Sequence, residues 1–356
     1  MNPSLPCAVL TPRLPPVSRI ALGSLTVSPM QANLPPEEAA DVLAYAFDSG
    51  INLVDTAQYY GNYPLLRLAF GRCRNPERVM LSTKTYAYSR SLAEEAVEEA
   101  RRETGRDVID LFMLHEQESY LTLKGHWEAL EYLFECREKG MIRAVGASTH
   151  HVALVRGLIR LKDEGFDTDV CHPLYNKAGI GVADGGESDM AAALGEAHAR
   201  GIGVLGMKAL GGGHLSISAE EALRFVLSKP YIDSVAVGMQ SAAEIDANLR
   251  LLREGSFSQT DREHLSQKRR TLHVEETCEG CGACVARCSE KALRLEPLTP
   301  ESGSGEPGGR DFSEAFRTEA GLSEEKILYR AVPDDGKCVR CGYCTKVCPV
   351  FALKIY

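Results

Sequence analysis

The chain has 356 residues, of which 44% are hydrophobic and 25% are charged, and its formal net charge is −9. This length and composition predict a globular protein with one large domain and a smaller one. The acidic balance argues against a nucleic-acid-binding surface, which needs clustered basic residues. The longest apolar runs, such as 201–207, are too short to span a membrane, and prolines interrupt residues 1–16 before a signal peptide could form. We therefore expect a cytoplasmic protein whose partners are small molecules and proteins.

Short apolar segments alternate with amphipathic stretches over roughly the first 250 residues. Eight strands are predicted over residues 19–23, 51–55, 79–83, 109–114, 142–147, 169–173, 203–207 and 234–238. Residues 35–50, 91–105 and 127–140 show helical periodicity, with acidic starts and a glycine at the end. This alternation predicts a (β/α)8 barrel, whose ligands bind at the carboxyl ends of the strands. A doubly wound sheet is the alternative, but "LGSLTVSP" after the first strand is not a dinucleotide-binding turn.

The barrel pattern ends after residues 244–252, and residues 258–277 read as a last surface helix and a linker. We therefore predict a barrel domain over residues 1–266 and a second domain over 267–356. Within the second domain "CEGCGACVARCSEKALRLE" and "CVRCGYCTKVCPVFALKIY" form an internal repeat at a constant offset of 60 residues. The intervening residues 296–327 begin rich in proline, glycine, serine and acidic residues, which predicts an inserted surface loop.

Eight of the twelve cysteines lie in these two repeats, each with the spacing C-x2-C-x2-C-x3-C. Such spacing allows three thiolates of one loop to bind one [4Fe–4S] cluster while the fourth reaches a second cluster. Zinc is the alternative, but zinc ribbons usually pair two C-x2-C knuckles across a longer gap. A purely structural role for the clusters stays open. The four scattered cysteines are expected to be small buried hydrophobic residues in a protein of a reducing compartment: Cys7, Cys73, Cys136 and Cys171.

The second domain resembles a bacterial two-cluster ferredoxin over residues 272–356. The crossed pattern of such ferredoxins assigns Cys278, Cys281, Cys284 and Cys348 to one cluster, and Cys338, Cys341, Cys344 and Cys288 to the other. Ser289 departs from the family pattern, which has a proline after the fourth cysteine, whereas Pro349 keeps it.

Polar residues follow three successive predicted strands, in "NLVDTAQYYG", "STKT" and "LFMLH". On these motifs residues 15–255 resemble the aldo-keto reductase superfamily, and more closely its branch with a C-terminal ferredoxin-like segment. The resemblance implies a catalytic tetrad formed by Asp55, Tyr60, Lys84 and His115. A carbonyl that receives hydride becomes an alkoxide, so it needs a positioned proton donor, for which Tyr60 is suited. Lys84, held by Asp55, is expected to stabilise the phenolate, and His115 to orient the carbonyl.

The same resemblance implies a nicotinamide cofactor and the residues that bind it. Ser148 matches the serine that holds the nicotinamide amide, and "CHPLYN" places His172 where the family has glutamine, followed by Asn176. The remaining candidates are Met207 against the nicotinamide ring, Gly211 near the pyrophosphate, and Gln240, Glu244 and Asn248 on the adenosine side. A carboxylate at Glu244 accepts from a ribose 2′-hydroxyl but repels a 2′-phosphate, so we expect NADH to be preferred over NADPH. Glu244 also suits a helix N-terminus, which is the structural alternative.

These features favour an oxidoreductase that transfers hydride between NAD(H) or NADP(H) and a small aldehyde or ketone in a low-oxygen cytoplasm. The alternative is an electron-transfer protein whose barrel is a docking or flavin-binding scaffold. No flavin motif is evident, so a flavin would have to occupy the barrel mouth or belong to a partner. We expect that partner to be a flavoprotein or a ferredoxin. Nothing in the sequence selects one carbonyl substrate.

Overall fold

The computed structural model describes residues 5–267, 271–297, 329–350 and 352–355. Two compact units, Met1–Arg269 and Arg270–Tyr356, divide the chain. They are called the barrel unit and the C-terminal unit below, and each is described by itself. Residues 296 and 297 of the predicted insertion end a strand, and the rest of that insertion lies outside the described residues.

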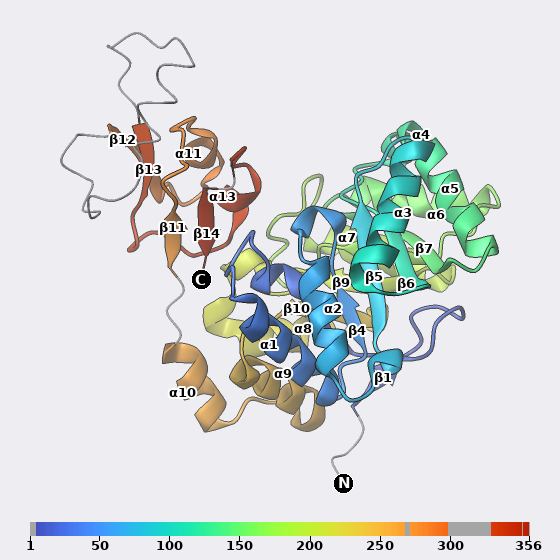
Figure 1. Ribbon diagram of the computed structural model, residues 1–356, viewed down its shortest axis with the longest axis horizontal. Helices are drawn as coiled ribbons and strands as arrows, with labels where there is room; N and C mark the ends of the chain where they lie inside the picture. Colours follow the sequence, from blue (N-terminus) through green and yellow to red (C-terminus); the bar gives the residue numbers. More distant parts are fainter. Residues whose placement is uncertain (1–4, 268–270, 298–328, 351, 356) are drawn as a thin grey trace. The chain divides into compact units, whose positions relative to one another are not determined.

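Eight parallel strands of the barrel unit close in the order β10-β3-β4-β5-β6-β7-β8-β9 (Figure 1). They are β3 Ile20–Gly23, β4 Leu53–Asp55, β5 Met80–Thr85, β6 Ile109–Leu114, β7 Ile142–Thr149, β8 Val170–Pro173, β9 Gly203–Met207 and β10 Ser234–Gly238. All eight predicted strands are confirmed, and the closed barrel excludes the doubly wound alternative. Two strands run further than predicted, so that Lys84 and Ser148 lie within β5 and β7 rather than after them.

Helices surround these strands on the outside (Figure 1). In chain order they are α1 Pro36–Asp48, α2 Tyr63–Arg72, α3 Arg90–Thr104, α4 Tyr120–Gly125, α5 Trp127–Glu138, α6 Val152–Asp163, α7 Glu187–Ala199, α8 Ala219–Leu227, α9 Ala242–Glu254 and α10 Gln259–Gln267. Helix α3 illustrates how the sequence sets their bounds. Ser89 accepts from the N–H of Leu92 at its start, Ala93, Ala96 and Val97 are among its buried residues, and Gly105 ends it with φ 70°.

Short 3₁₀ helices connect several of these elements: η1 Ser24–Val27, η2 Gln58–Tyr60, η3 Pro76–Arg78, η4 Gly211–Gly213 and η5 Ser216–Ser218. Among the described residues, no helix combines the length and the apolar character needed to cross a membrane.

The amino-terminal end of the barrel is closed by the chain's first segment. The unpredicted strands β1 Cys7–Ala8 and β2 Val17–Ser18 pair antiparallel, and Leu10, Leu14 and Val17 pack into the barrel interior. A side chain at Gly203, the first residue of β9, would collide with the carbonyl oxygen of Leu10. The open end of the barrel is therefore the one at the carboxyl ends of the strands, where the candidate site residues lie. Cys7 is exposed in β1, which corrects the expectation that it is buried, whereas the other three scattered cysteines are buried.

In its described residues, the C-terminal unit contains two antiparallel strand pairs and two short helices. Strand β11 Leu272–Val274 pairs with β14 Leu353–Ile355, and β12 Leu293–Pro297 pairs with β13 Tyr329–Pro333. The helices, α11 Ala283–Arg287 and α13 Tyr343–Lys346, begin 60 residues apart, at the same position of each repeat. Their small core contains cysteines together with aliphatic residues such as Leu272, Leu293 and Leu353.

Candidate functional site

A buried ion pair lies where strands β4 and β5 end. The Lys84 Nζ atom donates to Asp55 Oδ1 and to the Thr56 carbonyl oxygen, both at 2.7 Å. The Lys84 side chain is fully buried, and only 7% of the Asp55 side chain is exposed. Burial alone would raise the pKa of Asp55, but the charges of Lys84 and His172 outweigh it and hold this pKa far below its usual range. Asp55 is therefore a carboxylate and keeps Lys84 in place.

Tyr60 and His115 complete the predicted tetrad beside this pair. Tyr60 lies in η2, directly after β4, and Lys84 Nζ is 5.4 Å from the centroid of its ring. His115 follows the last residue of β6, and its ring meets that of Tyr60 edge-on with centroids 5.8 Å apart. The structure thus brings four residues from three successive strand ends to one point at the open end of the barrel.

The protonation of Tyr60 differs from the expectation drawn from the sequence. Burial, followed by the negative charges of Asp55 and Glu116, raises the pKa of Tyr60 well above 10. The expectation was that Lys84 stabilises the phenolate. In the protein alone, the carboxylate that holds Lys84 also faces Tyr60 and offsets the ammonium charge. Tyr60 therefore carries its proton throughout the neutral range.

Two residues next to the tetrad were missed by the sequence analysis. The ring of Tyr86 stacks on His115 with centroids 4.4 Å apart, and its hydroxyl donates to Glu116 over 2.7 Å. Glu116 has a left-handed backbone with φ 47°, and its N–H donates to Ser148 Oγ at 2.9 Å. Strain of this kind in a non-glycine residue is often found at functional sites. The signal available from the sequence was position, since both follow a predicted strand within three residues.

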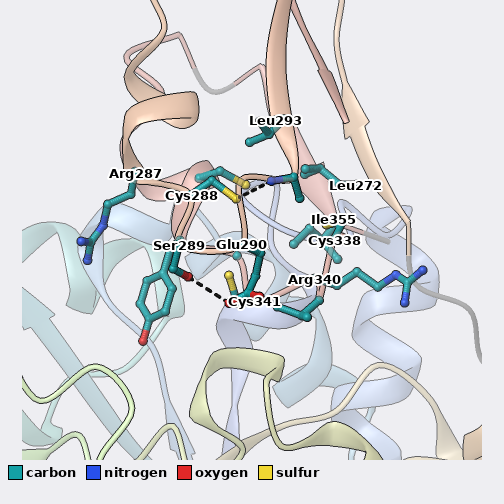
Figure 2. Close-up of a pocket in the computed structure, with 15 residues that line it drawn as sticks. Leu272, Arg287, Cys288, Ser289, Glu290, Leu293, Cys338, Arg340, Cys341 and Ile355 are labelled. Atoms are coloured by element: carbon teal, nitrogen blue, oxygen red, sulfur yellow. Dashed lines mark hydrogen bonds between the residues drawn. The ribbon is translucent and has the colours of Figure 1, made fainter. Parts of the chain in front are cut away.

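The eight clustered cysteines line two separate cavities of the C-terminal unit. The first sulfur cavity is lined by Cys278, Cys281, Cys284 and Cys348. The second sulfur cavity, shown in Figure 2, is lined by Cys288, Cys338, Cys341 and Cys344. Each cavity thus combines three cysteines of one repeat with the fourth cysteine of the other, which is the crossed set expected from the sequence. Backbone N–H groups point at the sulfurs, as from Ala292 to Cys288 at 3.3 Å. Four cysteines that line one cavity, with amide donors to sulfur, suit a [4Fe–4S] cluster.

Residues 19–221 match the Aldo/keto reductase family. The chain belongs to this family. Residues 277–352 match the 4Fe-4S dicluster domain, which agrees with the two sulfur cavities and favours iron–sulfur clusters over zinc. The chain therefore combines a family barrel with a C-terminal 4Fe-4S dicluster domain.

Its relatives cover the two parts separately. An aldo-keto reductase from Mycolicibacterium paratuberculosis is 29% identical over 152 residues, which are 41% of this chain and 52% of the relative. Ferredoxin-3 from Rhodobacter capsulatus is 30% identical over 77 residues, covering 21% of this chain and 68% of the ferredoxin. An aldo-keto reductase structure from Pseudomonas aeruginosa has a TM-score of 0.57 at 24% identity, covering 70% of this chain and 95% of that one, and supports the fold alone. The chain spans about half the length of the first curated relatives that it matches.

His172 lies closer to the tetrad than the sequence analysis anticipated. It was expected to contact nicotinamide. Its Nε2 atom lies 3.4 Å from Asp55 Oδ2, and its Nδ1 atom contacts the carbonyl oxygen of Leu205. Strands β4 and β8 stand four places apart in the eight-stranded barrel, so this contact crosses the interior. His172 thus supports the Asp55 carboxylate.

The other residues expected to bind nicotinamide lie at the ends of β7 to β9. Ser148 is fully buried, and because its oxygen accepts from Glu116, its hydroxyl proton remains available to donate. Asn176 holds its own loop, since its side chain accepts from the N–H of Ile180 and donates to that residue's carbonyl oxygen. Met207 ends β9 and is partly exposed. The next residue, Lys208, was missed by the sequence analysis; it has φ 55° and a buried Nζ atom.

Four further candidates lie in η4 and around the start of α9. Gly211, with φ 58°, begins a run of three glycines with left-handed backbones. The Glu244 side chain accepts from the N–H of Gln240, and its own N–H donates to Ser241 Oγ at the first turn of α9. Asn248 lies one turn further along this helix and is buried. Glu244 therefore stabilises the helix start, as the structural alternative stated.

Proposed function

We propose that the protein transfers hydride between a nicotinamide cofactor and a small aldehyde or ketone. The observation that carries this proposal is the convergence of the buried Asp55–Lys84 pair with Tyr60 and His115 at the open end of a family barrel. A nicotinamide cofactor, when bound, supplies or accepts the hydride. Every other part of the chemistry falls to residues of this chain.

Tyr60 would donate its proton to the carbonyl oxygen as negative charge develops there. Burial and the negative charges of Asp55 and Glu116 raise the pKa of Tyr60, so its hydroxyl carries the proton that reduction of a carbonyl requires. His115, fixed between the rings of Tyr60 and Tyr86, would set the angle of the carbonyl. Asp55 and Lys84 would provide fixed charges next to the reacting groups, and these charges would not need to reorient during the reaction.

The residues at the ends of β7 and β9 fit a dinucleotide. Ser148 retains a hydroxyl proton for the nicotinamide amide, and Met207 offers a partly exposed thioether to the ring. Lys208 adds a positive charge three residues before Gly211, the first of three glycines, and left-handed glycines allow a close approach of backbone to phosphate.

NADH is the expected cofactor, because a Glu244 carboxylate on the adenosine side would repel a 2′-phosphate. We expect E244Q to narrow the preference for NADH over NADPH by about tenfold, which corresponds to ~1.4 kcal/mol. Cofactor affinities from fluorescence titration would show this, with E254Q at the far end of the same helix as a control. Tighter binding of NADPH than of NADH to the wild-type protein would contradict this expectation.

The two clusters would serve a separate redox partner, a flavoprotein or a ferredoxin. A hydride carries two electrons together, whereas a [4Fe–4S] site exchanges one at a time, so a flavin is needed to divide the pair. The setting that suits both chemistries is a reducing cytoplasm with little oxygen.

We expect NADH alone to reduce the clusters slowly or not at all. The test follows the visible cluster absorbance of anaerobic, flavin-free protein after mixing with NADH, beside carbonyl turnover. Addition of a flavin or a flavoprotein should make the bleaching fast. If NADH alone bleached the clusters at the rate of carbonyl turnover, no flavin would be required between the hydride and the clusters.

A second candidate function is electron transfer with the barrel as a docking or flavin-binding scaffold, favoured by the two complete sets of four cysteines. Titration of the anaerobically purified protein with NADH, NADPH and flavins, followed by a carbonyl reduction assay, separates the two functions. Nicotinamide binding with carbonyl turnover supports the reductase. Flavin binding without either one supports the scaffold.

A further inference from the structure

The two copies of the cysteine repeat have the same spacing, but they carry different residues at one position with a left-handed backbone. The third residue of each cysteine motif has a left-handed backbone, with φ 63° at Gly280 and φ 57° at Arg340. Glycine adopts this conformation without steric cost, and a side chain at Gly280 would collide with the carbonyl oxygen of Tyr329. Arg340 occupies the equivalent position in spite of the strain that a Cβ atom brings. The second repeat therefore places a long cationic side chain where the first has none.

The side chain of Arg340 lies at one side of the second sulfur cavity. Arg340 lines this cavity, and its Nε atom is buried with no hydrogen-bond acceptor among the described residues. Figure 2 shows Arg287 and Arg340 at opposite sides of the cavity. A positive charge thus lies at the edge of this cavity.

Among the described residues, the charged side chains that line the second cavity carry a net positive charge, and those that line the first carry a net negative charge. Two arginines, Arg287 and Arg340, and one glutamate, Glu290, line the second cavity. Glu279 is the one charged residue, apart from cysteines, that is found lining the first cavity in the described part of the chain. Arg287, Glu290 and Glu279 are exposed and screened by water, whereas Arg340 is half-buried, so Arg340 makes the main difference.

We propose that Arg340 gives the site of Cys288, Cys338, Cys341 and Cys344 the higher reduction potential of the two. One-electron reduction adds one negative charge to a cluster and changes no bond, so a fixed cation nearby favours the reduced state. Electrons delivered by a one-electron donor, such as a reduced flavodoxin or ferredoxin, would collect at this site. Amide donors to sulfur do not explain a difference in reduction potential, because each site has at least one such donor. The exposure of Cys281 favours reduction of the first site, and Arg340 outweighs it.

The test is an anaerobic redox titration of the full chain with dithionite and mediators, followed by electron paramagnetic resonance. The wild-type protein should show two separate one-electron waves. R340G, which installs the residue that the first repeat uses at the same backbone conformation, should shift the upper wave to lower potential and leave the lower wave in place. R340K should retain most of the wild-type separation because it keeps the charge. R294Q, on exposed β12 outside both cavities, is the control and should shift neither wave.

Iron and sulfide content, measured for every variant, separates a change in potential from the loss of a cluster. If R340G loses iron, R340Q takes its place, since it removes the charge and keeps most of the side chain. Unchanged potentials in a charge-removing variant with full iron content would overturn the proposal, as would a shift of the lower wave alone. The redox titration does not measure carbonyl reduction, so its result tests this proposal independently of the proposed hydride transfer.

Discussion

Replacement of Tyr60 by phenylalanine should lower carbonyl reduction by about 100-fold or more, the loss expected when a positioned general acid is removed. The affinity for NADH should stay nearly unchanged, because the hydroxyl acts on the developing alkoxide and not on the nicotinamide. The ring and its edge-on contact with His115 would remain. Steady-state turnover, together with a fluorescence titration of NADH, gives both quantities.

Tyr63→Phe is the matched control for this variant. Tyr63 is also buried, and its hydroxyl lies 2.6 Å from Thr83 Oγ1, but it belongs to α2 and not to the tetrad. It should cost some stability and leave turnover close to that of the wild type. If Y60F also kept near wild-type turnover, Tyr60 would not be the proton donor.

The sequence predicted those parts of the site that depend on short-range spacing. Asp55 and Tyr60 are five residues apart, and Lys84 and His115 each sit at a strand end, so a barrel is enough to bring them together. The cysteine sets were equally predictable, because the repeat fixes which three sulfurs share a loop.

Contacts that cross the barrel were not predictable in the same way. The approach of His172 to Asp55 depends on two strands on opposite sides of the barrel and on which side chains point inward. A one-residue difference in strand register reverses that direction, and apolar strands with no clear alternation do not reveal it. The raised pKa of Tyr60 was missed for a related reason. It depends on Glu116 and on burial, neither of which a motif contains.

The strongest effect on stability is expected from Lys84→Met. Removal of the ammonium leaves the Asp55 carboxylate buried, with the Ser82 hydroxyl at 3.1 Å and His172 Nε2 at 3.4 Å as its remaining side-chain contacts. Loss of one partner of a buried ion pair typically costs about 3–5 kcal/mol of unfolding free energy. Trp127 is the single tryptophan of the chain and lies in α5, so its fluorescence during urea unfolding reports on the barrel unit. Carbonyl reduction should also fall steeply, since Lys84 is part of the tetrad.

Two further variants separate the structural role of Lys84 from its catalytic role. Lys177→Met removes a lysine that pairs with Glu221 over 2.9 Å at the surface, where such a pair contributes about 0–1 kcal/mol. The double variant D55N/K84M removes both buried charges, so it should regain much of the stability that K84M loses, because no carboxylate is left without its partner. It should not regain activity, since neither the ammonium nor its orienting carboxylate remains. A double variant as unstable as K84M would mean that Lys84 stabilises the barrel through packing and its bond to Thr56, with Asp55 contributing little.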